Sequence, residues 1–205
     1  MIWLTSDTHW THANIIKYCN RPFTHVDEMD EHLISKINEY VKPGDTLYHL
    51  GDFAFNRRSL DVYYNIRKQI KCKTIHFVFG NHDDTLEQKR DYLEKIFASY
   101  PEYLKEIDVN NQRIVCAHYA LAVWNKSHRG AWHLYGHSHS EAEDYLNKAF
   151  PNRKSMDVGV DNAYKLLGEY RPFSFDEIKA IMDKRAGCAI DHHTQDMSRR
   201  YYNAS

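Results

Sequence analysis

The chain has 205 residues, 42% of them hydrophobic and 14% aromatic, which is enough apolar surface for one folded domain and excludes wholesale disorder. Lys and Arg number 27 against 28 Asp and Glu, so the formal net charge of -1 gives no support to a protein that coats nucleic acid or an anionic membrane. No apolar stretch approaches the ~20 residues of a membrane-spanning helix, and the first residues lack the pattern of a secretory signal.

Short apolar runs alternate with amphipathic segments through the first half of the chain. This pattern is typical of an α/β domain in which parallel strands are joined by right-handed crossovers. Glycine follows two of the expected strands, and Pro101 ends the last expected helix of this half. The expected order is strand, helix, strand, helix, strand, helix, over residues 1–6, 26–41, 46–50, 60–70, 74–79 and 84–100.

The second half of the chain predicts strands that are not all parallel. Asn110 and Asn111 lie between two apolar runs, as in a hairpin turn. Ser174, followed three residues later by Glu177, has the pattern of a capping box at the start of a closing helix. The expected strands are 103–109, 112–117, 132–135 and 156–160, with a polar loop over 140–155 and the closing helix over 174–185. We therefore expect one domain over residues 1–186 and a tail over 187–205.

Five short polar signatures follow expected strands, at the sheet edge where α/β proteins bind their ligands. Residues i and i+2 of an extended chain point the same way, so Asp7 and His9 can reach one ion. Glycine before several of these polar residues lets the backbone turn sharply. The signatures are Asp7-Thr8-His9, Gly51-Asp52, Gly80-Asn81-His82-Asp83, His118 and Gly136-His137-Ser138-His139.

These signatures supply a set of metal ligands without sulfur. Leaving His82 aside, they contain two aspartates, one asparagine and four of the chain's 14 histidines. The four cysteines, at positions 19, 72, 116 and 188, form no CxxC pair, which also fits a reducing compartment. An oxygen and nitrogen set favours Mn²⁺, iron or Zn²⁺ over a structural zinc site. Seven ligands suit two ions if one carboxylate bridges them.

In this order the signatures form the pattern DxH…GD…GNH[DE]…H…GHxH, which resembles the calcineurin-like metallophosphoesterases and spans residues 7 to 139. The stretches DTHWTHANIIKYCNRPF and VWNKSHRGAWHLYGHSH are most similar to small single-domain bacterial and phage members. The resemblance implies a four-layer α/β/β/α sandwich of two mixed sheets, with the metal site at the carboxyl ends of the strands. It implies one metal on Asp7, His9, Asp52 and His139, and a second on Asp52, Asn81, His118 and His137.

Two cations ~3.5–4 Å apart would hold a bridging hydroxide that attacks phosphorus, while their charge stabilises the transition state. We expect two divalent ions, with manganese favoured and iron, zinc and nickel as alternatives. The resemblance keeps His82 off the metals, where it would protonate the leaving oxygen as a general acid. Asp83 follows it directly and is the second expected catalytic residue, although adjacent side chains need not face each other.

One departure from the protein Ser/Thr phosphatases of the superfamily narrows the expected function. Those enzymes carry GDxxDRG, whereas this chain has Phe55 and Asn56 at the Asp and Arg positions. The Asp that would orient the catalytic histidine and the Arg that would grip phosphate are therefore missing there, which argues against a protein phosphatase. Arg57 or Arg58 could substitute only by local rearrangement.

Five further residues are candidate substrate contacts: His12, Asn14, Arg21, Lys126 and Arg129. His12 and Asn14 follow the first signature, where an exposed polar loop is an equal alternative. Arg21 could bind phosphate through two N–H groups, or be an ordinary surface arginine. Lys126 and Arg129 lie between two expected ligands in the chain, which favours a role in steering phosphate.

We therefore expect a cytoplasmic enzyme that hydrolyses a phosphodiester or phosphomonoester, with a nucleotide among the candidate substrates. We expect no membrane association and no nucleic-acid-binding surface. Two alternatives stay open. One is a catalytically silent metal-binding scaffold of the same fold, and the other is a nuclease that uses the basic segment 126–129.

Overall fold

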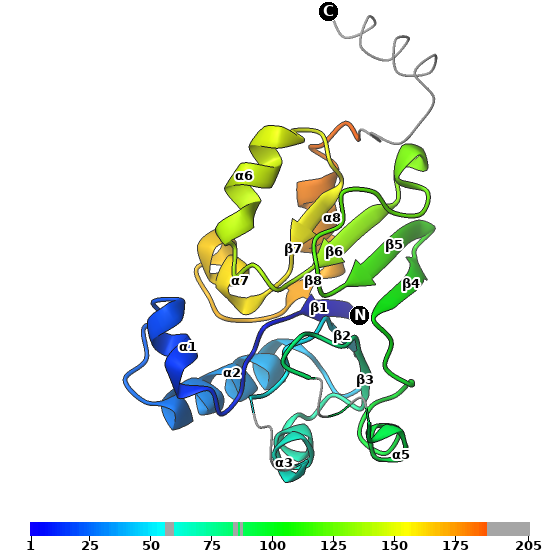
Figure 1. Ribbon diagram of the computed structural model, residues 1–205. Helices are drawn as coiled ribbons and strands as arrows, with labels where there is room; N and C mark the ends of the chain where they lie inside the picture. The colour runs from blue at the N-terminus through cyan, green and yellow to red at the C-terminus, as the bar shows by residue number, and fades with distance from the viewer. Residues whose placement is uncertain (56–59, 84–85, 87, 188–205) are drawn as a thin grey trace, which may run out of the picture.

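The computed structural model describes residues 1–55, 60–83, 86 and 88–187. It contains two four-stranded sheets, with strand orders β3-β2-β1-β8 and β4-β5-β6-β7 (Figure 1). Each sheet has two parallel pairs and one antiparallel pair, so both are mixed, and the expected α/β fold is confirmed. Apart from Gly187, the expected tail lies outside the described residues.

The first sheet carries the amino-terminal half of the chain. β1 (Ile2–Thr5) pairs in parallel with β2 (Thr46–His49), which pairs in parallel with β3 (Thr74–Phe77). β8 (Phe173–Ser174) joins the other side of β1 in the antiparallel direction. Because the first three strands are parallel, the chain leaves all of them at the same edge of the sheet.

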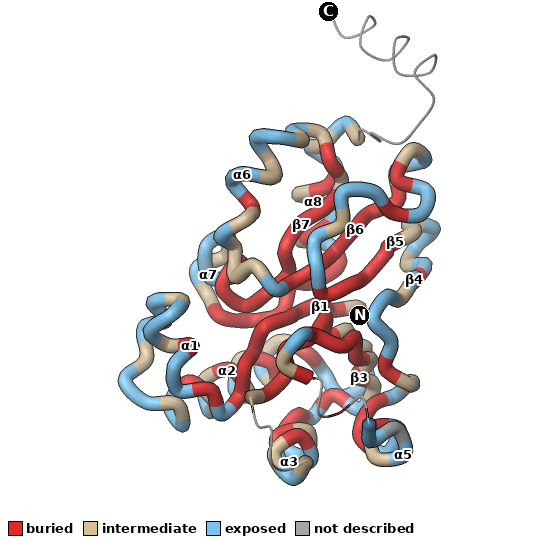
Figure 2. The backbone as a smooth tube through the Cα atoms, in the orientation of Figure 1, coloured by how far each residue is buried: buried red, intermediate tan, exposed pale blue. Residues whose placement is uncertain are grey.

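α2 (Val26–Tyr40) and α3 (Asp61–Gln69) form the crossovers between these strands and pack on one face of the first sheet. The buried residues of α2 are Met29, Leu33 and Ile37, spaced four apart so that they share one helix face. Figure 2 shows the buried strands and the exposed outer surface of these helices. The apolar strand side chains that reach this core are Trp3, Leu47, Ile75 and Phe77.

The second sheet begins with the hairpin that the sequence predicts. β4 (Leu104–Val109) and β5 (Gln112–Ala117) pair in antiparallel fashion. The turn residues Asn110 and Asn111 have φ values of 49° and 65°, a left-handed conformation that asparagine adopts more readily than most residues. The remaining strands, each parallel to its neighbour, are β6 (Trp132–Tyr135) and β7 (Ser155–Asp157).

The closing helix, α8 (Phe175–Met182), begins with the expected capping box. Glu177 N donates to Ser174 Oγ at 3.2 Å, and Ser174 N donates to the Glu177 carboxylate at 2.8 Å. The helix ends at Met182, three residues earlier than expected. Its buried side chains join the core that lies between the two sheets, which includes Leu4, Val78, Ile114, Trp132, Leu134 and Phe173.

Three helices were not expected from the sequence: α1 (Ala13–Tyr18), α6 (Glu141–Ala149) and α7 (Val160–Leu167). The prediction of a polar loop over 140–155 is wrong, because α6 occupies much of that segment. Ala142, Tyr145, Leu146 and Ala149 recur at helical spacing, but the buried residue of the helix is the polar Glu143. The strand expected at 156–160 ends at Asp157, whose carboxylate accepts from Gly159 N at 2.6 Å and turns the chain into α7. None of the described helices is both long and apolar enough to cross a membrane.

The long helix expected over 84–100 is wrong in its described part, residues 86 and 88–100. α5 (Arg90–Leu93) is followed by turns and bends up to Tyr100. Leu93, Ile96 and Phe97 are buried in the first core, so short helical turns satisfy the apolar spacing that suggested one helix. Ala98 N then donates to Ile75 O at 2.8 Å, a contact with β3 that a continuous helix would not allow.

One buried histidine on the second sheet is disfavoured from taking up a proton. His133 is fully buried on β6, where its Nδ1 donates to Val115 O at 2.9 Å and its Nε2 accepts from Leu121 N at 3.0 Å. A proton on Nε2 would lose the contact with Leu121 N but could be donated to Tyr119 O at 3.2 Å, so burial is the main factor that opposes protonation. Burial therefore lowers the pKa of His133 to about 4.

We expect the free energy of unfolding to fall as the pH drops from 6.5 to about 4, because the unfolded chain binds a proton that folded His133 does not. One histidine with this shift contributes on the order of 3 kcal/mol over that interval. Urea titrations at neutral and acidic pH would measure the loss, and His133→Gln should reduce it. An equal loss in the variant would show that other groups cause the acid sensitivity.

Candidate metal centre

The polar signatures lie together at the carboxyl ends of the strands of both sheets. In the first sheet they follow β1, β2 and β3, and in the second they follow the parallel strands β5 and β6. An isolated parallel bridge pairs Ser6 with Gly159, and Val160 N donates to Ser6 O at 3.1 Å. These contacts connect the first sheet to the chain that follows β7, so the site is built from both sheets.

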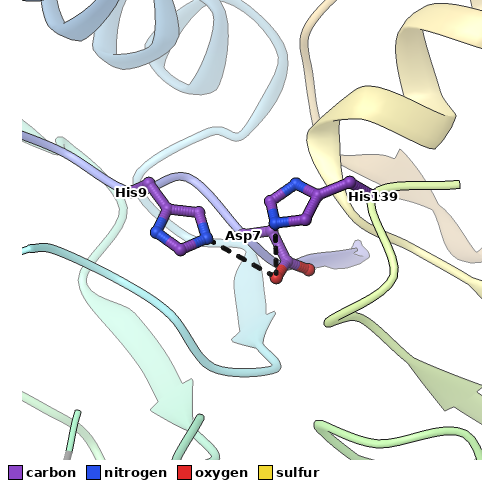
Figure 3. Close-up of side chains that lie close together, drawn as sticks. All are labelled: Asp7, His9 and His139. Carbon is purple, nitrogen blue, oxygen red and sulfur yellow. Dashed lines mark ion pairs between the residues drawn. The ribbon is translucent and has the colours of Figure 1, made fainter. Parts of the chain in front are cut away.

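Asp7, His9 and His139 form the first group of ligands (Figure 3). His9 Nε2 and His139 Nε2 each lie 3.9 Å from Asp7 Oδ1, and the two rings stack with their centroids 5.1 Å apart. The ligand atoms of all three residues lie within 4.8 Å of one another. Although His139 is far from the other two in the chain, the three atoms are close enough to share one cation.

Asp52, His118 and His137 form the second group, again with ligand atoms within 4.8 Å of one another. Asn81 completes it, because its Oδ1 lies 3.0 Å from His118 Nε2 and 2.8 Å from His137 Nδ1. The amide oxygen therefore lies between the two rings.

One oxygen of Asp52 belongs to both groups. Asp52 Oδ2 lies 3.4 Å from His9 Nε2 and 3.4 Å from His118 Nε2. The other oxygen, Oδ1, accepts a hydrogen bond from His82 N at 2.9 Å, which holds the carboxylate in place. One charged oxygen therefore lies close to a ring nitrogen of each group.

Five of these side chains extend from left-handed backbone. The φ values are 56° at Asp7, 51° at His9, 53° at Asp52, 68° at His137 and 48° at His139. This conformation costs a non-glycine residue about 1–2 kcal/mol, and such strain concentrates at functional sites. The surrounding fold must therefore stabilise these loops, which direct the five side chains into one volume.

The glycines before the ligands are required by close packing. Gly51 has a φ of 96°, and a Cβ there would lie 2.6 Å from His118 Nδ1. A Cβ on Gly136 would collide with Ser6 Oγ and the Asp7 carboxylate. Glycine at these positions lets loops of the two sheets touch.

The residues present fit a site for cations. His9 Nε2 is buried without a hydrogen-bond partner among the described residues. Burial opposes the charged form of His118, yet its hydrogen bond to Asp52 and the nearby Asp7 charge raise its pKa to about 9. The histidine is thus protonated next to the buried carboxylates of Asp7 and Asp52, and its positive charge stabilises their negative charge. A divalent cation would take over that role and displace the proton.

His82 lies beside both groups and is more exposed than His9, Asp52 and His118, although less exposed than His137. Its Nε2 is 4.0 Å from Asp52 Oδ2, and its side chain is 28% exposed, against 2% for Asp52. Its ring centroid is 5.2 Å from that of His9. By distance alone His82 could join His9 and Asp52 as a ligand, and its partly exposed ring is also open to a substrate.

Phe55, which stands where the protein phosphatases have Asp, gives His82 an aromatic neighbour 5.4 Å away. The His12 ring stacks on Phe55 at 3.9 Å, and His12 Nδ1 lies 3.5 Å from His9 Nδ1. Burial lowers the pKa of His12 to about 4, so this ring reaches the cluster uncharged. Asn14 is exposed on α1, and no contact of its side chain with the cluster is found in the described chain. Asn56, Arg57 and Arg58 lie outside the described residues.

Asp83 supports the loops rather than the His82 ring. Its Oδ2 accepts from Asp52 N at 2.7 Å and from Gly80 N at 2.8 Å, and its Oδ1 accepts from Phe53 N at 3.2 Å. Burial raises the pKa of Asp83 to about 8. The carboxyl group therefore positions the loop that carries Asp52, and no described contact joins it to the His82 ring.

Arg21 was expected to bind substrate, but the structure places it inside the protein, where its N–H donors bond to other residues of the chain. Its Nε and Nη2 each donate to the Asp161 carboxylate at 2.8 Å, and Nη2 also donates to Asp7 O at 2.7 Å. The residue is 3% exposed. Asp161 Oδ2 in turn accepts from His139 Nδ1 at 2.6 Å. Arg21 thus fixes the backbone of one ligand and, through Asp161, the ring of another.

Lys126 and Arg129 were also expected to contact the substrate, but they lie away from the cluster of ligands. β5 and β6 are parallel, so the chain that leaves His118 must return along the strand before β6 begins. The adjoining 3₁₀ turn, Ser127–Arg129, lies at that far end, where Gln112 Nε2 at the start of β5 donates to Gly130 O at 3.1 Å. Strands of this length put roughly 10–20 Å between the basic pair and the ligands.

Two buried carboxylates were missed in the sequence, Asp157 and Asp161. Asp157 Oδ2 accepts from Ser138 Oγ at 2.8 Å and from Ser140 N at 3.1 Å, so it supports the loop of His137 and His139 as Asp83 supports that of Asp52. Neither belongs to a recognisable spacing. The available signal was weak: Asp157 lies within the strand expected over 156–160, and Asp161 directly follows it.

The chain belongs to the calcineurin-like phosphoesterase family, whose model matches residues 1–172. It is therefore a hydrolase of phosphate esters, and the family implies divalent metal ions. An uncharacterized protein of Methanocaldococcus jannaschii is 31% identical over 183 residues, covering 89% of this chain and 92% of that protein.

One solved structure shows the same fold. A protein of unknown function from Aquifex aeolicus is 25% identical with a TM-score of 0.66, over 88% of this chain and 98% of the other. An archaeal phosphodiesterase is 20% identical over 82% of this chain and 87% of its own, with a TM-score of 0.44. The similarity to the archaeal phosphodiesterase is too low to indicate the substrate of this protein.

Proposed function

We propose that this protein hydrolyses phosphate monoesters or diesters with two divalent cations, which the two ligand groups would hold and to which Asp52 would be a shared ligand. The observation that carries the proposal is the position of Asp52 Oδ2, 3.4 Å from a ring nitrogen of each group. Manganese is the favoured ion, with iron, zinc and nickel as alternatives, because the ligand set offers oxygen and nitrogen without thiolate.

The residues of the chain determine the charge of this centre. When bound, the two cations would supply positive charge at the phosphoryl oxygens and a water acidic enough to attack phosphorus at neutral pH. The ligands contribute only two carboxylates, Asp7 and Asp52, because Asn81 and the histidines bind as neutral groups. The loaded site therefore stays positive and attracts an anionic phosphate.

His82 is the residue we assign as general acid. Its ring lies next to the shared oxygen of Asp52 yet stays partly exposed, so a leaving oxygen can approach it. A proton given to that oxygen lets an alcohol leave in place of an alkoxide. Asp83 acts as a positioning residue, through the backbone N–H groups of Asp52 and Gly80.

Asp161 should tune metal binding through His139. Its hydrogen bond with Nδ1 leaves Nε2 of the ring directed at Asp7. We expect Asp161→Asn to weaken Mn²⁺ binding about 10–100-fold, as loss of a charged partner behind a ligating histidine does. Calorimetric titration would measure it, with Asp144→Asn as control because Asp144 is exposed and pairs only with Lys165 among the described residues. Unchanged affinity would contradict this role.

Metal content and turnover test the proposed function together. The metal-free protein would be reloaded with Mn²⁺ and its ions counted by elemental analysis. The loaded protein would then be offered p-nitrophenyl phosphate, bis-p-nitrophenyl phosphate, and linear and cyclic nucleotides. Two ions per chain and hydrolysis of at least one ester class are expected. Two ions without hydrolysis of any ester would overturn the proposal in favour of a silent scaffold, and fewer than two would overturn the dinuclear site.

A further inference from the structure

A cavity of about 610 Å³ opens beside the first group of ligands. His9, His82 and His139 form part of its wall, so it is continuous with the candidate metal centre. From there it extends along residues of α1, the start of α6 and α7, which lie on one side of the molecule (Figure 1). This volume is typical of small-molecule sites and exceeds what a phosphoryl group fills, so it has room for the rest of an ester.

The wall of the cavity away from the metal ligands is aromatic. It contains Tyr18 at the end of α1 and Tyr164 and Tyr170 from α7 and the loop after it. Tyr164 stacks on Tyr170 at 4.5 Å with an angle of 12° between the rings. Tyr170 is 4% exposed while Tyr164 is 46% exposed, so a buried ring holds an accessible one in place. Such a fixed ring offers a platform for a planar group.

The charged groups of the same wall do not favour an anionic occupant. Lys165 already pairs with Asp144 at 3.1 Å, and Asp161 pairs with Arg21 and His139. Glu141 also lines the cavity, and within the described ranges no cation lies in salt-bridge contact with it. A second phosphate would meet this carboxylate, whereas amino and hydroxyl groups could donate to it.

We propose that the cavity binds the alcohol part of the substrate and that this part is a neutral nucleoside, whose base stacks on Tyr164 and Tyr18. The inference rests on the proposed function, because it places the oxygen that leaves phosphorus next to His82. Water attacks phosphorus, the bond from phosphorus to the nucleoside oxygen breaks, and that oxygen takes the proton of His82. The substrate class is therefore a nucleoside ester of phosphate, either a monoester or a diester.

Matched esters that differ only in the base test this assignment. Adenosine 5′-monophosphate would be compared with ribose 5-phosphate, and the methyl ester of each would serve if the enzyme prefers diesters. The two members of a pair have the same type of leaving oxygen, so the ratio of their kcat/KM values reports the contact with the base. We expect the wild-type ratio to be about tenfold or more in favour of the nucleoside.

Removal of one ring should lower that ratio. Tyr164→Leu and, separately, Tyr18→Leu are each expected to reduce it several-fold, because leucine keeps the bulk but not the aromatic face. Tyr145→Leu is the matched control, since Tyr145 is 74% exposed on α6 and does not line the cavity. Tyr18 is itself 71% exposed, so its variant tests the proposal even if Tyr164→Leu fails to fold.

Binding of adenosine, which carries no phosphate, separates this inference from the proposed function. Calorimetry should show binding that Tyr18→Leu and Tyr164→Leu weaken and Tyr145→Leu does not. If both members of an ester pair react equally and adenosine does not bind, the nucleoside assignment is overturned while hydrolysis stands. If adenosine binds through the tyrosines but no ester reacts, the assignment of the cavity stands and the proposed function fails.

Discussion

The Asp52→Asn variant is expected to bind fewer than two divalent ions and to lose about 10³-fold in kcat on any ester that the wild type hydrolyses. An asparagine keeps an oxygen that can accept the hydrogen bond from His82 N. It cannot supply the charged oxygen that lies 3.4 Å from both His9 Nε2 and His118 Nε2. Loss of this one atom should therefore disturb both groups at once. Elemental analysis and steady-state kinetics on the same preparation would measure the two effects.

Asp108→Asn is the control for this substitution. Asp108 is exposed on β4 and pairs with Arg113 at 2.7 Å, so its replacement should change neither metal content nor kcat. Circular dichroism would show whether the Asp52 variant still folds. A folded variant that keeps two ions and near-normal turnover would contradict the bridging role of Asp52.

The candidate ligands were predictable because each lies within a few residues of a strand end. Asp7 and His9 follow β1, Asp52 follows β2, and Asn81 follows β3, so the order of the strands alone brings these side chains to one edge. Glycine marked several of these turns, and the structure shows the reason at Gly51, where there is no space for a Cβ.

The errors arose where a side chain's partner is distant in the sequence. Arg21 lies near the first signature, but its partner Asp161 is 140 positions away, and only the tertiary fold shows that the guanidinium is used internally. Lys126 and Arg129 lie between two ligands in sequence, yet the parallel pairing of β5 with β6 carries them to the other end of the sheet. Residues that are close in the sequence are therefore far apart in the fold where the chain crosses between two parallel strands.

Helix α6 was missed for a related reason. Its buried residue is a glutamate, Glu143, which pairs with the buried Arg153 at 2.8 Å. The apolar residues Ala142, Tyr145, Leu146 and Ala149 do recur at helical spacing, so the periodicity was present but was obscured by the polar composition of the segment. The ion pair itself could not be read from the sequence.

His82→Gln is expected to keep both metal ions and to lose turnover. On esters with an alcohol leaving group, such as a nucleoside monophosphate, we expect a loss of about 10²–10⁴-fold in kcat, the range that general acid catalysis supplies. Glutamine can still donate a hydrogen bond from this partly exposed position beside Asp52, but it cannot transfer a proton. His25→Gln is the control, because His25 is exposed at the start of α2 and makes no side-chain capping bond.

The leaving group distinguishes proton transfer from other roles of His82. p-Nitrophenolate leaves without a proton, so on p-nitrophenyl esters the same variant should lose about tenfold or less. Equal losses on both kinds of ester would show that the ring stabilises the phosphoryl group rather than protonating the leaving oxygen. Loss of a metal ion from the variant would instead assign His82 as a ligand, a role that its distance from His9 and Asp52 permits. Only retained metal together with a loss that grows as the leaving group becomes more basic identifies His82 as the acid.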